Sequence, residues 1–110
     1  MALYQLIRSL RRSRIRLEIL RVLCQTGEPM YPALLAKAIG VSYENVVGAL
    51  RGLGRRYKKE DSLVGLGLVK EIKIGRQCVY IVDEDVCSKL VELEELITFS
   101  KNNLHSKKIL

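Results

Sequence analysis

The sequence predicts a mostly helical α+β domain in which three core helices precede a β-hairpin and another helix follows it. Three observations support this prediction. Apolar residues recur at three- and four-residue steps through the first half of the chain, as in amphipathic helices. Two β-branched runs, 69–74 and 77–82, are separated by two residues, and helical spacing returns after residue 83. A chain of 110 residues is sufficient for one such domain.

The first helical region is expected over residues 3–25, where apolar stripes alternate with arginines. The first stripe consists of Leu3, Leu6, Ile7 and Leu10. The second consists of Ile15, Ile19, Val22 and Leu23. Ser9 and Ser13 leave open whether this region is one long helix or two helices with a break near Arg12. A glycine and a proline in Thr26-Gly27-Glu28-Pro29 predict its end.

A short second helix is expected after Pro32 and ends at Gly40. Ser42 is the expected N-cap of a third helix over about 43–53, because its hydroxyl can accept a backbone N–H of the first turn. The charged segment 54–61 has two open interpretations, a loop or a continuation of this helix. Residues 62–66 can add a further helical turn.

The hairpin turn is predicted at Gly75-Arg76, where glycine supplies the positive φ of a two-residue loop. Asp83-Glu84-Asp85 favours the start of the last helix, because acidic groups stabilise a helix N-terminus. The apolar residues of that helix follow a nearly heptad spacing, which is typical of a helix that pairs with another helix. They are Val86, Leu90, Leu93, Ile97 and Leu104.

Charge is distributed unevenly along the chain. Residues 1–82 carry 15 Lys/Arg and 6 Asp/Glu, a net charge of +9, whereas residues 83–110 carry a net charge of −2. A basic body favours a polyanionic partner, although a solubilising surface is the simpler alternative. The N-terminus does not resemble a signal peptide and no apolar run is long enough to cross a bilayer, so a cytoplasmic location is expected.

The three cysteines, Cys24, Cys78 and Cys87, include no Cys-x-x-Cys pair, and the single histidine is His105. This set predicts no metal site and no cofactor, because zinc needs about four suitably spaced ligands. The odd number of cysteines predicts inert buried thiols rather than disulfides, although Cys87 of two subunits can also meet and respond to oxidation. No nucleophile and base can be paired, so no enzymatic activity is expected.

The order of elements over residues 13–82 resembles that of winged helix-turn-helix regulators of the ArsR and MarR type, especially archaeal single-domain members. The matching segments are 16–23 in the first core helix, 32–40 as the positioning helix, 42–51 as the recognition helix and 66–69 before the wing. Two departures limit what the resemblance implies. About a dozen additional residues follow the recognition helix, and the metal-sensing cysteine pair of some ArsR-type proteins is absent.

The resemblance implies that the third helix enters the major groove of double-stranded DNA. Ser42, Tyr43, Glu44, Asn45, Gly48 and Arg51 are the candidate contacts in this helix. Asn45 and Arg51 are expected to reach base edges or phosphates. Two glycines within a helix cost about 1 kcal/mol each relative to alanine, so Gly48 and Gly52 need an explanation. They allow either close approach of the helix to DNA, which we favour, or close packing within the domain.

Basic residues outside this helix are expected to contact the DNA backbone or the minor groove. They are Arg55, Arg56, Lys58 and Lys59 in the segment after the helix, and Lys73 and Arg76 in the hairpin. The alternative for both groups is a solvated surface.

A homodimer is expected, because symmetric dimers are the commonest oligomers and a domain of this size has little core left for two flanking helices. The expected interface residues are Leu3, Leu6, Ile7, Leu10, Leu90, Leu93 and Ile97. The alternative is that the flanking segments, 3–12 and 83–105, close the core of a monomer. Any small-molecule effector, whose identity the sequence leaves unknown, is expected between the dimer helices and the DNA-contacting part.

The sequence therefore predicts a dimeric, sequence-specific DNA-binding regulator. Two alternatives remain. A winged helix used for protein contacts predicts a conspicuous apolar patch on the recognition face, and an architectural protein predicts DNA binding without sequence preference.

Overall fold

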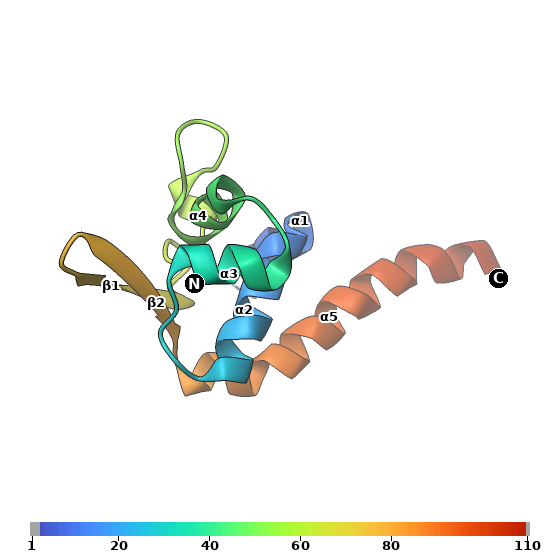
Figure 1. Cartoon of the computed structure of the whole chain (residues 1–110). Helices are drawn as coiled ribbons and strands as arrows, with labels where there is room; N and C mark the ends of the chain where they lie inside the picture. Colours follow the sequence, from blue (N-terminus) through green and yellow to red (C-terminus); the bar gives the residue numbers. More distant parts are fainter. Residues whose placement is uncertain (1–2, 110) are drawn as a thin grey trace.

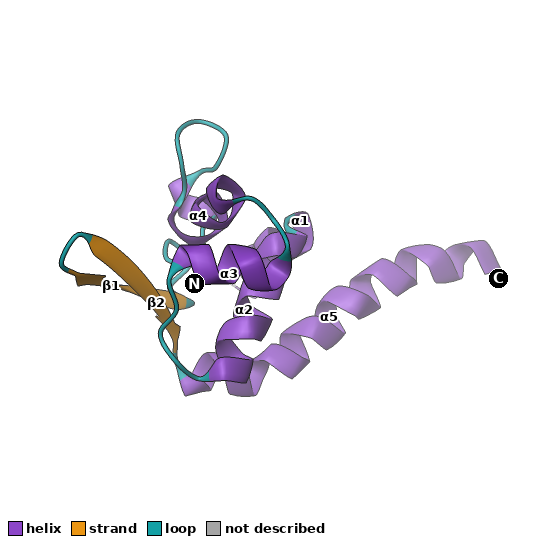
Figure 2. Cartoon of the chain, in the orientation of Figure 1, coloured by secondary structure: helices purple, strands orange, loops and turns teal. Residues whose placement is uncertain are grey.

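The computed structural model describes residues 3–109, and the surroundings of side chains for residues 6–96. Helices form one body, a two-stranded hairpin projects from one side of it, and the last helix extends away on the opposite side (Figures 1 and 2). The elements are α1 (Leu3–Arg12), α2 (Arg14–Thr26), α3 (Pro32–Ile39), α4 (Tyr43–Arg51), the 3₁₀ helix η1 (Lys59–Asp61), β1 (Val69–Ile74), β2 (Gln77–Val82) and α5 (Glu84–Ile109).

The N-terminal helical region consists of two helices separated at Ser13. The Ser13 hydroxyl accepts the backbone N–H of Arg16 at 3.2 Å and so caps α2. The sequence left open whether this region is one helix or two. The structure has two helices, and the break falls one residue after Arg12. The ends of α2 at Gly27 and of α3 at Gly40 agree with the prediction.

Helix α4 begins as predicted and ends two residues early. The Ser42 hydroxyl accepts the backbone N–H of Asn45 at 3.2 Å, as expected for an N-cap. The helix stops at Arg51 because Gly52 has a φ of 88°, outside the helical range. The backbones of Leu53 and Tyr57 then form a bridge that closes a turn. The segment after α4 is therefore a loop followed by η1, rather than a continuation of the helix.

The hairpin has the predicted strands and turn. Val69 pairs with Val82 at its base and Ile74 with Gln77 at its tip, with Gly75 and Arg76 between them. Gly75 has a φ of 63°, which a two-residue hairpin loop requires at its first position. The base of the hairpin is attached to the body through a bridge between Tyr80 and Met30.

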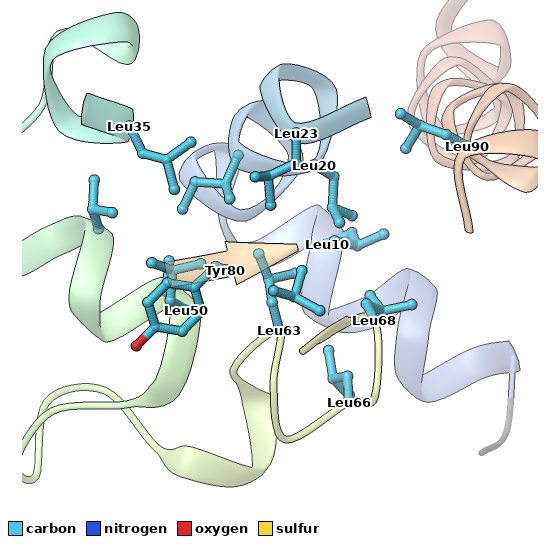
Figure 3. Close-up of a cluster of buried hydrophobic side chains, with 14 of the residues drawn as sticks. Leu10, Leu20, Leu23, Leu35, Leu50, Leu63, Leu66, Leu68, Tyr80 and Leu90 are labelled. Atoms are coloured by element: carbon cyan, nitrogen blue, oxygen red, sulfur yellow. The ribbon is translucent and has the colours of Figure 1, made fainter. Parts of the chain in front are cut away.

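One hydrophobic core joins the helices to the base of the hairpin (Figure 3). Leu20 and Leu23 of α2 are fully buried, as are Leu35 of α3 and Leu50 of α4. The ring of Tyr80 lies among these leucines with its hydroxyl directed away from them. Each such side chain contributes roughly 1.5–3 kcal/mol through burial. This core fixes α3, α4 and the hairpin relative to one another.

Arg16 is buried, although the sequence pattern placed it among the intervening polar positions. Its Nη1 donates to the backbone carbonyl of Ser9 at 2.9 Å and to the Ser9 hydroxyl at 2.8 Å. The Ser9 hydroxyl donates in turn to the carbonyl of Asp61 at 2.9 Å. Burial lowers the pKa of the Arg16 guanidinium, and the Asp61 carboxylate partly opposes this shift. These contacts hold α1, α2 and η1 together.

The expectation of three unpaired thiols is wrong. Cys24 near the end of α2 and Cys87 near the start of α5 form a disulfide, with their Cα atoms 5.5 Å apart. Cys87 is therefore bonded within its own chain, and Cys78 is the free cysteine. An odd cysteine count excludes complete pairing but not a single bridge, which depends on proximity in the fold.

The flanking helices α1 and α5 contribute to the core of the single chain. Leu10, Leu90 and Leu93 are at most 8% exposed, and Leu6 and Ile7 are half-buried against the core. The expectation that these side chains face a second subunit is therefore wrong for the three buried leucines, because the chain itself covers them. Leu3 and Ile97 lie in α1 and α5, and their side chains are outside the described part.

Within residues 3–109, no single helix is long and apolar enough to span a membrane. One bent pair, α3 with α4 at 116°, meets the length and composition criteria.

Candidate nucleic-acid interface

Helix α4 exposes only its two ends. Its interior, residues 46–50, is buried against α2, α3 and the following loop. Tyr43 and Glu44 are exposed in the first turn, and Arg51 is exposed at the end of the helix. In helix-turn-helix proteins the first residues of the recognition helix contact base edges. The accessible part of α4 is therefore its N-terminal turn together with Arg51.

The face of α4 that carries Gly48 is covered by Tyr57 from the loop. Any side chain at position 48 would overlap the Tyr57 ring. The Tyr57 hydroxyl donates a hydrogen bond to Oδ1 of the half-buried Asn45. The expectation that Gly48 faces DNA is thus wrong, since the glycine permits close packing within the domain. The same applies to Gly52, where a Cβ would lie 2.9 Å from Cα of Lys59.

The basic segment after α4 lies on the surface as a protruding loop (Figure 1). Arg55, Arg56, Lys58 and Lys59 are all exposed, and none of them forms an ion pair within the described residues. The Arg56 guanidinium lies 5.4 Å from the centre of the Tyr57 ring, which orients it by a cation–π contact. The loop thus presents four cations that solvent or an anionic partner can reach.

The hairpin projects from the body in a different direction from this loop (Figure 1). Lys73 in β1 and Arg76 in the turn are exposed. The tip itself is apolar on one side, because Ile72 and Ile74 are 41% and 54% exposed. The predicted basic positions of the wing are therefore accessible, at the end that lies farthest from the core.

A groove separates the hairpin from α3 and α4. Its volume is about 550 Å³, and we call it the aromatic groove because Tyr31 and Tyr43 line it. Leu34, Arg51, Arg76 and Cys78 also line it. Of the predicted DNA contacts, the groove brings Tyr43, Arg51 and Arg76 together. The basic loop and Asn45 lie outside its lining.

Tyr80 closes the inner end of the groove. Its hydroxyl donates to Oε2 of Glu71 on the paired strand at 2.5 Å. Burial raises the pKa of Tyr80 well above its usual range, with the Glu71 contact adding to the shift and the Arg51 charge opposing it. The phenol is therefore neutral, and it links the two strands where the hairpin meets the body.

No group of three or more His, Cys, Asp or Glu side chains that could hold a metal ion occurs among the described residues. The disulfide removes two of the three cysteines from consideration as ligands.

The arrangement defines a winged helix-turn-helix: α3 and α4 form the helix-turn-helix and β1–β2 the wing. A solved structure with the same fold is an ArsR-like transcriptional regulator from Rhodococcus sp. RHA1, with a TM-score of 0.55 and 23% identity over 96% of this chain and 88% of that one.

Residues 6–91 match the EarA-like family, and the chain belongs to that family. An uncharacterised protein of Methanocaldococcus jannaschii is 33% identical over 89 residues, which cover 80% of this chain and 79% of that protein.

Sequence reasoning did not identify four features of this surface. The sequence pattern did not single out Tyr31 and placed Leu34 only in a short helix, yet the two residues are 37% and 52% exposed. Tyr57 was grouped with the basic residues, whereas it anchors the loop. Cys78 was expected to be an inert core thiol and instead lines the groove. A signal for Tyr57 was present, because Gly48 in mid-helix already indicated a close neighbour.

Proposed function

We propose that this protein is a sequence-specific regulator that binds double-stranded DNA through α4 and the hairpin. The observation that carries the proposal is the exposure of the α4 N-terminal turn beside a projecting wing with Arg76 at its tip. An excess of positive charge on residues 1–82 supports a polyanionic partner. A cytoplasmic location is part of the proposal, and no catalytic role is proposed.

The exposed residues divide into base-reading and backbone-contacting groups. Tyr43 and Glu44 project from the first turn of α4, where base edges are reached; glutamate accepts from the amino group of cytosine. Arg51 and Arg76 flank the aromatic groove, so that one DNA strand passing between helix and wing would meet both guanidinium groups. The remaining backbone contacts are Ser42, Arg55, Arg56, Lys58, Lys59 and Lys73.

Asn45 has a positioning role in this proposal. Its side chain holds Tyr57, and Tyr57 holds the basic loop against α4. The loop therefore extends the DNA-contacting surface beyond the short recognition helix.

We propose a homodimer that forms through α5 rather than through the buried leucines. Val91 on the described part of α5 is 62% exposed and Leu96 is 41% exposed. Helix α5 also extends well beyond the body (Figure 1), which gives it room to pair with a second copy. A two-fold protein of this kind would read two half-sites related by symmetry.

Binding to a random-sequence duplex across a salt series tests the proposal. Each phosphate neutralised contributes about −0.9 to the slope of log K against log salt, so Arg51→Gln and Arg76→Gln should each make the slope shallower by about 1. Arg14→Gln is the charge-matched control, because Arg14 is exposed on α2 and lies outside the aromatic groove. Affinity without salt dependence, or equal effects of all three variants, would contradict the proposal.

Selection from genomic fragments then distinguishes a regulator from an architectural protein. A regulator enriches one motif, and Glu44→Gln alters the preferred base at one position in each half-site. An architectural protein retains the salt slope and enriches no motif.

One observation favours a second candidate function, a winged helix that binds another protein. Tyr31, Leu34 and Tyr43 are exposed on the recognition face and together form the apolar patch expected of that class. If the salt series shows no DNA binding, this patch becomes the surface to test, through loss of partner binding in Leu34→Glu.

A further inference from the structure

The aromatic groove has the dimensions and composition of a small-molecule site. Its volume of about 550 Å³ lies within the range of ligand pockets, which are mostly apolar with a few converging polar groups. Tyr31 and Leu34 contribute apolar surface from the start of α3, and Tyr43 contributes its ring from α4. The Tyr43 side chain is 56% exposed despite its apolar ring. Covering this exposed apolar surface with a ligand is favourable, because it removes apolar area from water.

The polar groups of the groove favour an anion. Arg51 at the end of α4 and Arg76 in the hairpin turn both line the groove, so its two cations come from different elements. Neither forms an ion pair within the described residues. The Glu71 carboxylate accepts a hydrogen bond from Tyr80 and does not line the groove. Guanidinium groups bind carboxylates through paired, charge-assisted hydrogen bonds.

We propose that the aromatic groove binds a flat organic carboxylate, with the apolar body against Tyr31, Leu34 and Tyr43 and the carboxylate between Arg51 and Arg76. This site is distinct from the region between dimer helices and the DNA-contacting part, where an effector was expected from the sequence. The binding site itself does not depend on the proposed function.

The consequence for regulation rests on the proposed function. Tyr43, Arg51 and Arg76 belong to both surfaces, so a bound carboxylate and a DNA strand exclude each other. A ligand that binds the free protein and not the DNA complex lowers the apparent DNA affinity by the factor 1 + [L]/Kd. The ligand therefore acts as an effector that releases DNA.

Cys78 provides a direct probe of occupancy without DNA. It lines the groove, and it is the single free thiol because Cys24 and Cys87 are bonded to each other. The rate of its alkylation by iodoacetamide is measured, without reductant, against increasing 2-naphthoate. The neutral control is 2-naphthamide, which has nearly the same shape. We expect saturable protection by the carboxylate and an apparent affinity at least about tenfold weaker for the amide, because charged hydrogen bonds are lost.

Variants assign the protection to the proposed residues. Each rate is compared with that of the same variant without ligand, so altered thiol reactivity cancels. Arg51→Gln and Arg76→Gln should each weaken protection about tenfold, whereas Arg14→Gln should leave it unchanged. Equal protection by carboxylate and amide, protection unaffected by both groove variants, or no saturable protection by 2-naphthoate would each overturn the proposal.

Adding duplex DNA separates this proposal from the proposed function. If 2-naphthoate protects Cys78 and lowers DNA affinity, both stand. If it protects Cys78 while no duplex binds at any salt concentration, the ligand site stands and DNA binding fails. If duplex DNA protects Cys78 and 2-naphthoate does not, DNA binding stands and the ligand site fails.

Discussion

Reduction of the Cys24–Cys87 disulfide should destabilise the protein substantially, because this bond joins segments far apart in the chain. The two cysteines are separated by 63 residues. Closing a loop of that size in the unfolded chain corresponds, in the chain-entropy account, to about 4 kcal/mol at 25 °C. With an unfolding entropy of roughly 2 cal/mol/K per residue over 110 residues, the expected decrease in Tm is about 18 °C.

The assay is thermal unfolding followed by circular dichroism, with and without an excess of a dithiol reductant. Cys78→Ser is the control, because it retains the disulfide and should show the same decrease on reduction. The Cys24→Ala/Cys87→Ala variant should unfold near the temperature of the reduced wild type and show no response to reductant. Identical unfolding of oxidised and reduced protein, with alkylation of all three cysteines in unreduced denatured samples, would refute the reasoning.

Three further predictions concern the loop, the hairpin and the dimer. Gly48→Ala should destabilise the wild type, because the added methyl group overlaps the Tyr57 ring. In a Tyr57→Ala background the same change should stabilise the protein by up to about 1 kcal/mol through helix propensity. Urea unfolding of the wild type, the two single variants and the double variant measures this, and equal effects in both backgrounds would exclude the contact. The raised pKa of Tyr80 makes its contribution to stability complete below the pKa of an unfolded tyrosine, about 10, and progressively lost above it. Tyr80→Phe should therefore flatten the decline of unfolding free energy between about pH 10 and 11, and an unchanged decline would contradict the shift. Val91→Glu should weaken the dimer at least tenfold in sedimentation equilibrium without lowering Tm of the monomer, whereas an unchanged dimer would place the interface elsewhere.

The hairpin and the helix ends could be predicted because their determinants are local. Two runs rich in β-branched residues mark the strands, and Gly75 between them satisfies a turn that only a few residue types permit. Ser42 caps the start of α4 through a residue three positions away, and Gly40 caps the end of α3 through a residue four positions away. Such features depend on neighbouring residues alone, so the sequence contains most of the information that determines them.

The contacts that were not predicted join residues distant in sequence. Tyr57 reaches back across a turn to cover Gly48, and this depends on how the loop after α4 folds. Leu10 and Leu90 have the same periodic spacing whether they face the chain's own core or a second copy, so periodicity alone does not distinguish these packings. The close approach of Cys24 and Cys87 follows from the placement of α5 against α2.

The sequence predicted which basic residues of the candidate site are exposed, but it did not predict the groove. The basic residues of the hairpin and of the loop are exposed as expected, since charged side chains rarely become buried. The aromatic groove was not foreseen, because it is formed by three elements whose relative positions depend on the whole core. Its lining combines Tyr31, Tyr43 and Arg76, which nothing in their local sequence connects.

Hydrogen exchange of the backbone, measured with and without excess random-sequence duplex at low salt, tests most directly that α4 and the hairpin form the DNA-binding surface. The account predicts slower exchange in the first turn of α4 at Tyr43 and Glu44 and in the hairpin turn at Gly75 and Arg76, with no change along α5. Slowing confined to α5, or no slowing at either the helix or the wing under conditions where the duplex is bound, would contradict it.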